Sequence, residues 1–89
     1  MSRDTPYAKE LKTAAISGPG GHESRIERLF VKDKEQEEIR FSWWVSGMMQ
    51  NRPLDLPEDE LARLIAKGIV EGVLSPLFLV NVQEAMAGR

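Results

Sequence analysis

Few residues in this chain of 89 can do acid, base or nucleophilic chemistry. Cysteine is absent, which excludes disulfides, thiolate catalysis and cysteine-based zinc sites. His22 is the only histidine, and its glycine-rich surroundings favour a solvated loop residue over a ligand or a catalyst. Covalent and acid–base catalysis need a nucleophile or proton donor beside a positioned base. The serines have no candidate base of this kind except His22, so we predict that the protein is not an enzyme.

Two carboxylate clusters and one glycine-rich loop are the other candidates for chemistry. "KEQEE", residues 34–38, is most simply a solvated turn, and "EDE", residues 58–60, is most simply the start of a helix. Glu37 and Glu38 lack the spacing of an EF-hand. "SGPGGHES", residues 17–24, can cradle an anion with backbone amides but lacks the Lys-Ser/Thr that completes a P-loop. We therefore expect no metal site and no cofactor.

The composition is typical of a small globular domain, with 42% hydrophobic and 29% charged residues. No apolar run approaches the roughly 18 residues of a membrane span. Lys9, Glu10 and Lys12 occupy the region where a secretory signal would be apolar. The net charge of −2 disfavours broad electrostatic binding to nucleic acid. We expect a cytoplasmic protein that does not bind membranes.

The pattern of apolar residues predicts an α+β fold, in which a small three-stranded antiparallel meander precedes two C-terminal helices. Residues 26–31 are rich in β-branched and aromatic types, and over residues 39–45 the apolar Ile39, Phe41, Trp43 and Val45 alternate with Arg40, Ser42 and Trp44. Ser46-Gly47 is a plausible tight turn into a third strand over residues 48–52. We predict a flexible or short-helical N-terminal arm over residues 1–25 and a single domain over residues 26–89.

Both helices have recognisable start signals. Pro57 and the acidic residues after it predict a helix whose apolar positions, spaced by three and four, face the sheet. Gly72 is expected to end it. Ser75-Pro76 repeats the start signal for a second helix that reaches about Met86.

The adjacent tryptophans pose a problem of direction, because neighbouring side chains on a strand point to opposite faces. We expect Trp43 to face the core and Trp44 to lie on the opposite face with Arg40 and Ser42. Exposed there, Trp44 and Arg40 would be typical binding hot spots. The alternative is that the N-terminal arm or the hairpin tip covers Trp44. Met48 is ambiguous, since methionine both fills cores and serves adaptable binding surfaces.

The last helix is too apolar for one buried face. Leu77-Phe78-Leu79-Val80 is followed by Val82 and Met86, and four consecutive residues span the whole helix circumference. Either the helix is wedged between the sheet and the preceding helix, or it meets a second protein molecule, and a homodimer is the leading expectation. The predicted protein-interaction residues are Arg40, Trp44, Met48, Leu77, Phe78, Leu79, Val80, Val82 and Met86.

Residues 39–79, "IRFSWWVSGMMQNRPLDLPEDELARLIAKGIVEGVLSPLFL", resemble the small pseudomonad quorum-sensing antiactivators of the QslA type. The resemblance rests on the tryptophan pair, "RPLDLPEDEL" and "EGVLSPLFL", and does not extend to the N-terminal arm. Proteins of this type bind the transcription factor LasR and disrupt its dimer. The resemblance implies an α+β protein that acts as a stoichiometric inhibitor, is dimeric and needs no cofactor.

Three functions are consistent with these features. The leading hypothesis is a small regulatory protein that binds and inhibits another protein, foremost a transcription factor, by occupying its interaction surface. A nucleic-acid-binding regulator using Lys32, Lys34 and Arg40 is the second, although neighbouring acidic residues largely neutralise that patch. A phage-type inhibitor of a host defence complex is the third.

Overall fold

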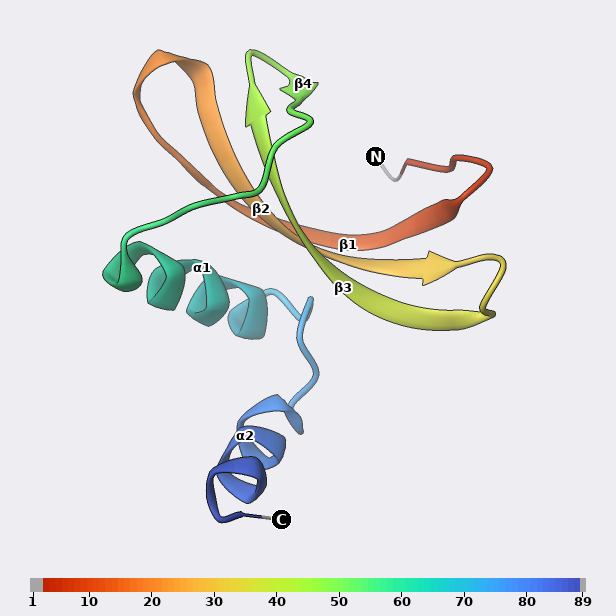
Figure 1. Ribbon diagram of the computed structural model, residues 1–89, viewed down its shortest axis with the longest axis vertical. Helices are drawn as coiled ribbons and strands as arrows, with labels where there is room; N and C mark the ends of the chain where they lie inside the picture. The colour runs from red at the N-terminus through yellow and green to blue at the C-terminus, as the bar shows by residue number, and fades with distance from the viewer. Residues whose placement is uncertain (1–2, 89) are drawn as a thin grey trace.

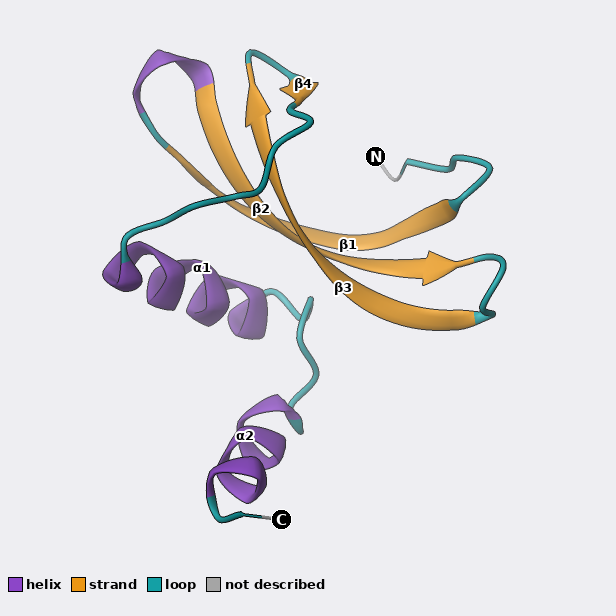
Figure 2. Cartoon of the chain, in the orientation of Figure 1, coloured by secondary structure: helices purple, strands orange, loops and turns teal. Residues whose placement is uncertain are grey.

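The computed structural model describes residues 3–88, and in this range four antiparallel strands form one open sheet accompanied by two helices (Figure 1). The α+β class is therefore confirmed, with four strands in place of three. Chain order and sheet order coincide, from β1 to β4. The elements in chain order, coloured by type in Figure 2, are β1 (Ala8–Ser17), a 3-10 turn (Pro19–Gly21), β2 (His22–Val31), β3 (Gln36–Val45), β4 (Met48–Met49), α1 (Glu58–Val70) and α2 (Phe78–Met86).

The segment expected as an N-terminal arm forms the first strand. β1 pairs with β2 from Ala8 opposite Val31 to Ser17 opposite Glu23. A register shift between Glu10 and Lys12 marks a β-bulge, which interrupts the period-two pattern of the sequence. The expectation of a flexible or short-helical arm is wrong over these residues, because pairing with β2 outweighs a weak helical preference.

The β-meander that follows agrees with the sequence pattern but differs in length. β2 and β3 each run for 10 residues and pair along their whole length. Ser46 and Gly47 both have positive φ, 49° and 81°, so the expected tight turn is confirmed. β4 contains only Met48–Met49, and the rest of the expected third strand crosses towards α1 as an irregular segment.

α1 covers the first two strands of the sheet. Leu64 and Gly68 are its buried residues, and Leu64 belongs to a core with Ala14 of β1 and Ile26 of β2. After the helix, Gly72 has a φ of 78°, which confirms that it ends α1. Val73 and Leu74, which follow it, donate their backbone N–H groups to the carbonyl of Gly68 and complete the core.

Gly68→Val is expected to lower the free energy of unfolding by about 1–3 kcal/mol, because it overpacks this core. A Cβ at position 68 would lie 3.1 Å from Ile26 Cγ2 and 3.2 Å from Ile26 Cδ1. Urea denaturation followed by circular dichroism measures the change. Ala66→Val is the control, since Ala66 is an exposed position of the same helix. Equal losses in the two variants would contradict this packing of α1 on β2.

The helix layer leaves part of its sheet face bare. α1 packs on β1 and β2, whereas Phe41 and Ile39 of β3 lie on the same face one strand farther out, opposite Ile26 and Arg28. Their side chains remain 44% and 37% exposed. We call this the helix-side face, and the opposite one, which carries Trp44, the outer face.

Candidate protein interface

The two tryptophans occupy the faces that alternation predicts, but the degree of burial is reversed. Trp43 shares the helix-side face with Ile39 and Phe41 and is only half-buried. Trp44 lies on the outer face and is 7% exposed. The expectation that Trp44 is exposed and Trp43 is core is therefore wrong, because α1 does not extend to β3.

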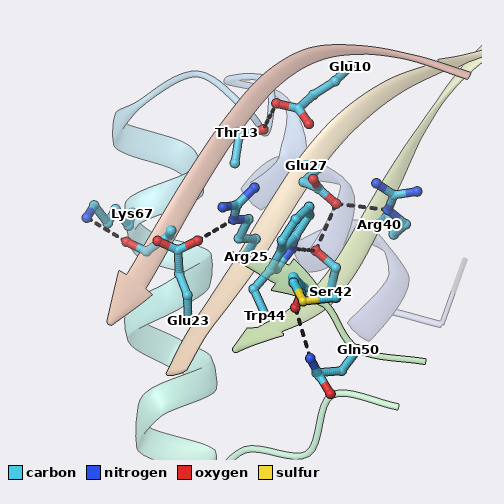
Figure 3. Close-up of polar contacts among 12 residues, drawn as sticks. Glu10, Thr13, Glu23, Arg25, Glu27, Arg40, Ser42, Trp44, Gln50 and Lys67 are labelled. Atoms are coloured by element: carbon cyan, nitrogen blue, oxygen red, sulfur yellow. Dashed lines mark hydrogen bonds and ion pairs between the residues drawn. The ribbon is translucent and has the colours of Figure 1, made fainter. Parts of the chain in front are cut away.

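Trp44 is enclosed by cationic and polar side chains of the outer face (Figure 3). The Arg25 guanidinium lies 3.8 Å from the centroid of its ring, and that of Arg3 lies 5.1 Å away. The indole Nε1 donates a hydrogen bond to Ser42 Oγ at 2.9 Å. Because Arg3 belongs to the N-terminal segment, the alternative that this segment helps to cover Trp44 is the correct one. The geometry makes Trp44 part of the structural core.

Arg40 is also held within the fold. Its Nε donates to Glu27 Oε1 at 2.8 Å, and Ser42 Oγ donates to the same oxygen at 2.9 Å (Figure 3). Glu27 is fully buried, and its other oxygen has no hydrogen-bond partner among the described residues. Arg40 supplies the charge that compensates this buried carboxylate, so its Nε is engaged within its own chain.

A second buried carboxylate lies nearby on the outer face. Glu10 accepts a hydrogen bond from Thr13 Oγ1 at 2.6 Å through one oxygen, and its other oxygen is buried without a partner among residues 3–88. Within the same described range, no group of three or more metal-ligating side chains is placed to hold a cation.

α2 projects away from the sheet and α1 (Figure 1). Phe78 packs against the core, while every other residue of the helix is exposed. The alternative in which the helix is wedged between the sheet and α1 is therefore wrong. We call Ile39 and Phe41, the exposed apolar residues of β3, the bare strip. We call this strip, Leu77 and the exposed large apolar residues of α2 the α2–β3 surface: Ile39, Phe41, Leu77, Leu79, Val80, Val82 and Met86.

One ion pair borders the β3 part of this surface. Arg28 lies opposite Ile39 and donates from Nη1 to Glu37 at 2.9 Å. Its Nε donates to the backbone carbonyl of Val73 at 2.7 Å. The strip therefore offers a partner apolar side chains bordered by a satisfied ion pair. Sequence reasoning placed Ile39 and Phe41 in the core and so missed them as candidate contact residues.

Met48 is exposed but lies elsewhere. It sits on β4 opposite Val45, at the far end of β3 from Ile39, with 71% of its surface exposed. The structure therefore separates Met48 from the α2–β3 surface.

A cleft of about 700 Å³ lies between the β1–β2 hairpin, β3 and the segment that leads into α1. Trp43 forms one wall, and its Nε1 donates to His22 Nδ1 at 3.2 Å. Arg52 and Arg63 also line it. His22 is exposed at the start of β2, and no nucleophile has a base at hydrogen-bonding distance there among the described residues.

The lysines that suggested nucleic-acid binding are both ion-paired. Lys32 contacts Asp4 at 2.5 Å and Lys34 contacts Glu38 at 3.1 Å. The hydrogen bond from Lys32 lowers the pKa of Asp4, and the hydrogen bond to Glu38 raises the pKa of Lys34. These pairs neutralise the positive charge that binding to phosphates would require.

No known family model, curated protein or solved structure matches this chain. Among residues 3–88, no helix is long and apolar enough to cross a membrane.

Proposed function

We propose that the protein is a small regulatory module that binds another protein through the α2–β3 surface and thereby inhibits it. The observation that carries this proposal is α2, an amphipathic helix whose apolar stripe has no counterpart in its own fold. Leu79, Val82 and Met86 repeat at i, i+3 and i+7 and are all exposed. Covering one such side chain fully is worth about 1.5–3 kcal/mol. A short amphipathic helix of this kind suits an apolar groove on a partner.

The proposed target is a transcription factor, as in a quorum-sensing antiactivator of the cytoplasm. The supporting observation is the resemblance of residues 39–79 to the QslA type, because this range includes the bare strip of β3 and the start of α2. A helix that enters a groove can displace the helix or strand with which the target dimerises. Inhibition of this kind is stoichiometric and needs no cofactor.

A phage-type inhibitor of a defence complex would use the same surface on a different target. Nucleic-acid binding is disfavoured by the paired lysines.

Binding to purified LasR by isothermal titration calorimetry tests the proposal. Replacing both Leu79 and Val82 with serine is expected to weaken binding by at least about 30-fold, the effect of losing roughly 2 kcal/mol at a hot spot. Met48→Ser is the control, since it removes an even more exposed apolar side chain that lies away from the surface. Equal affinities of the two variants would contradict the assignment of the surface.

A second experiment separates the surface from the identity of the target. If the native chain does not bind LasR, this target is rejected. A photo-crosslinking residue at position 79 then tests the broader proposal in the native host, with the same residue at position 48 as the control. Capture of a defined protein only from position 79 supports it, and failure to capture any protein would overturn it.

A further inference from the structure

We propose that the cleft beside Trp43 binds a small zwitterionic ligand with apolar side groups, of the size and chemistry of a short peptide whose two ends are free. The cleft shares no residue with the α2–β3 surface, so the proposal goes beyond the proposed function and does not depend on it. Its volume of about 700 Å³ lies within the range of roughly 300–1,000 Å³ that is typical of small-molecule sites.

The floor of the cleft is a row of three side chains on the helix-side face of the sheet. Ser24 of β2 lies opposite Ile16 of β1 and opposite Trp43 of β3. All three line the cleft and are half-buried. The Ser24 hydroxyl has no hydrogen-bond partner among residues 3–88. It therefore offers a ligand one polar contact between two apolar side chains.

The segment between β4 and α1 supplies an apolar wall. It runs from β4 across to the start of α1 (Figure 1), and its Leu54 and Leu56 pack against the core. Both leucines also line the cleft, as does the indole of Trp43. An indole suits contact with an aromatic ring, and leucine side chains suit an aliphatic group. These walls favour a ligand with apolar side groups over a fully polar one.

His22 gives the cleft a second uncharged polar group. Its Nδ1 accepts a hydrogen bond from Trp43 Nε1 at 3.2 Å. A neutral imidazole accepts through one nitrogen and donates through the other, so the ring proton is on Nε2. Within the described part of the chain, Nε2 has no hydrogen-bond partner. His22 and Ser24 are therefore both available to the amide groups of a peptide.

Four charged side chains line the cleft, and none of them is paired within residues 3–88: Arg52, Asp55, Glu60 and Arg63. The arginines of β2 and β3 differ in this respect, because each of them forms an ion pair with a glutamate of its own chain: Arg25, Arg28 and Arg40. The cleft thus gathers arginines whose guanidinium donors are free to bind a carboxylate.

The presence of both charge signs determines the class of ligand. A ligand with only negative charge, such as a phosphate, would be repelled by Asp55 and Glu60. A ligand with only positive charge would be repelled by the two arginines. A peptide with free ends carries a carboxylate for the arginines, an ammonium group for the acidic side chains, and amide and apolar groups between them. It therefore matches all the groups that line the cleft.

Titration with the tripeptide leucylglycylphenylalanine tests the proposal, with the indole N–H signals of ¹⁵N-labelled protein as the NMR readout. The chain has two tryptophans, which lie on opposite faces of β3. We expect a saturable shift of the Trp43 signal and an unchanged Trp44 signal, and Trp43→Phe identifies which is which. No saturable shift up to the solubility limit of the tripeptide would overturn the proposal. Equal shifts of both signals would also overturn it, because binding would then not be confined to the cleft.

Three related compounds test the chemistry of the ligand. Acetylation of the tripeptide removes its ammonium group, and amidation removes its carboxylate. Each change is expected to weaken binding at least about 10-fold, the effect of losing a hydrogen bond between charged groups. Triglycine retains both charges without apolar side groups and is expected to lose binding to at least the same extent. Undiminished binding of any of the three compounds would overturn the assigned class of ligand.

A variant of the cleft tests the role of the two arginines. Arg52→Gln combined with Arg63→Gln is expected to weaken tripeptide binding at least about 10-fold. Both side chains are exposed, so thermal denaturation is expected to show an unchanged fold. Lys32→Gln combined with Lys34→Gln is the control, since it removes the same charge beyond the other end of β2. Equal affinities of the two double variants would overturn the assignment of the arginines to the site.

Discussion

Trp44→Ala is expected to lower the free energy of unfolding by about 3–5 kcal/mol, the usual effect of truncating a buried aromatic side chain. The indole fills the outer face between Arg25 and Ser42 and is 7% exposed. Its removal leaves a cavity and two polar groups without their contacts. Because small domains are stable by only about 5–15 kcal/mol, the variant is expected to be partly unfolded at 37 °C. Urea denaturation followed by far-ultraviolet circular dichroism measures the loss.

Trp43→Ala is the matched control for this prediction. Trp43 is half-buried at the edge of the cleft and its Nε1 contacts His22, which is itself exposed. We expect a loss of about 1 kcal/mol, typical of a partly exposed position. A larger loss for Trp43 than for Trp44 would show that the buried and exposed faces of β3 are assigned the wrong way round.

Arg40→Ala is expected to lower the free energy of unfolding by about 2–4 kcal/mol, because it leaves a buried charge uncompensated. Glu27 is fully buried, and Arg40 and Ser42 donate the hydrogen bonds that its carboxylate accepts from described side chains. After the substitution, only the neutral Ser42 hydroxyl remains. Thermal and urea denaturation at pH 7 both measure this change.

A second substitution distinguishes a lost charge partner from lost packing. Glu27→Gln in the Arg40→Ala background removes the uncompensated charge, so the double variant is expected to regain part of the stability. If Arg40→Ala leaves stability unchanged and weakens only binding to LasR, Arg40 is a contact residue, as the sequence suggested, and its structural role is refuted.

The alternation of residues 39–45 predicted correctly which side chains share a face of β3, and the start of α1 and its end at Gly72 were also readable. The sequence did not predict which face of β3 is buried, since this depends on how far the helix layer extends across the sheet. Trp44 was consequently assigned to binding, and Phe41 to the core. Periodicity records the two sides of a strand but does not say what covers each.

The first strand was missed for a different reason. "AKELKTAAIS" contains alanine, lysine and glutamate, which favour helices, and the bulge after Glu10 disrupts its alternation. Its strand structure depends on pairing with β2, a contact between segments separated by a turn. For the last helix, the sequence did indicate more apolar surface than one face can bury. Because α2 lies away from the sheet, this apolar surface is exposed on α2.

Hydrogen exchange of the α2 amides tests most directly the claim that this helix acts by packing on another molecule. A helix of nine residues anchored in its own chain by Phe78 is marginally stable in water. We predict that its amides exchange rapidly below 1 µM protein and become protected at tens of micromolar or with a bound target, while the β2–β3 amides stay equally protected throughout. Strong protection of α2 that is the same at every concentration would contradict the account, because the helix would then be packed on its own chain.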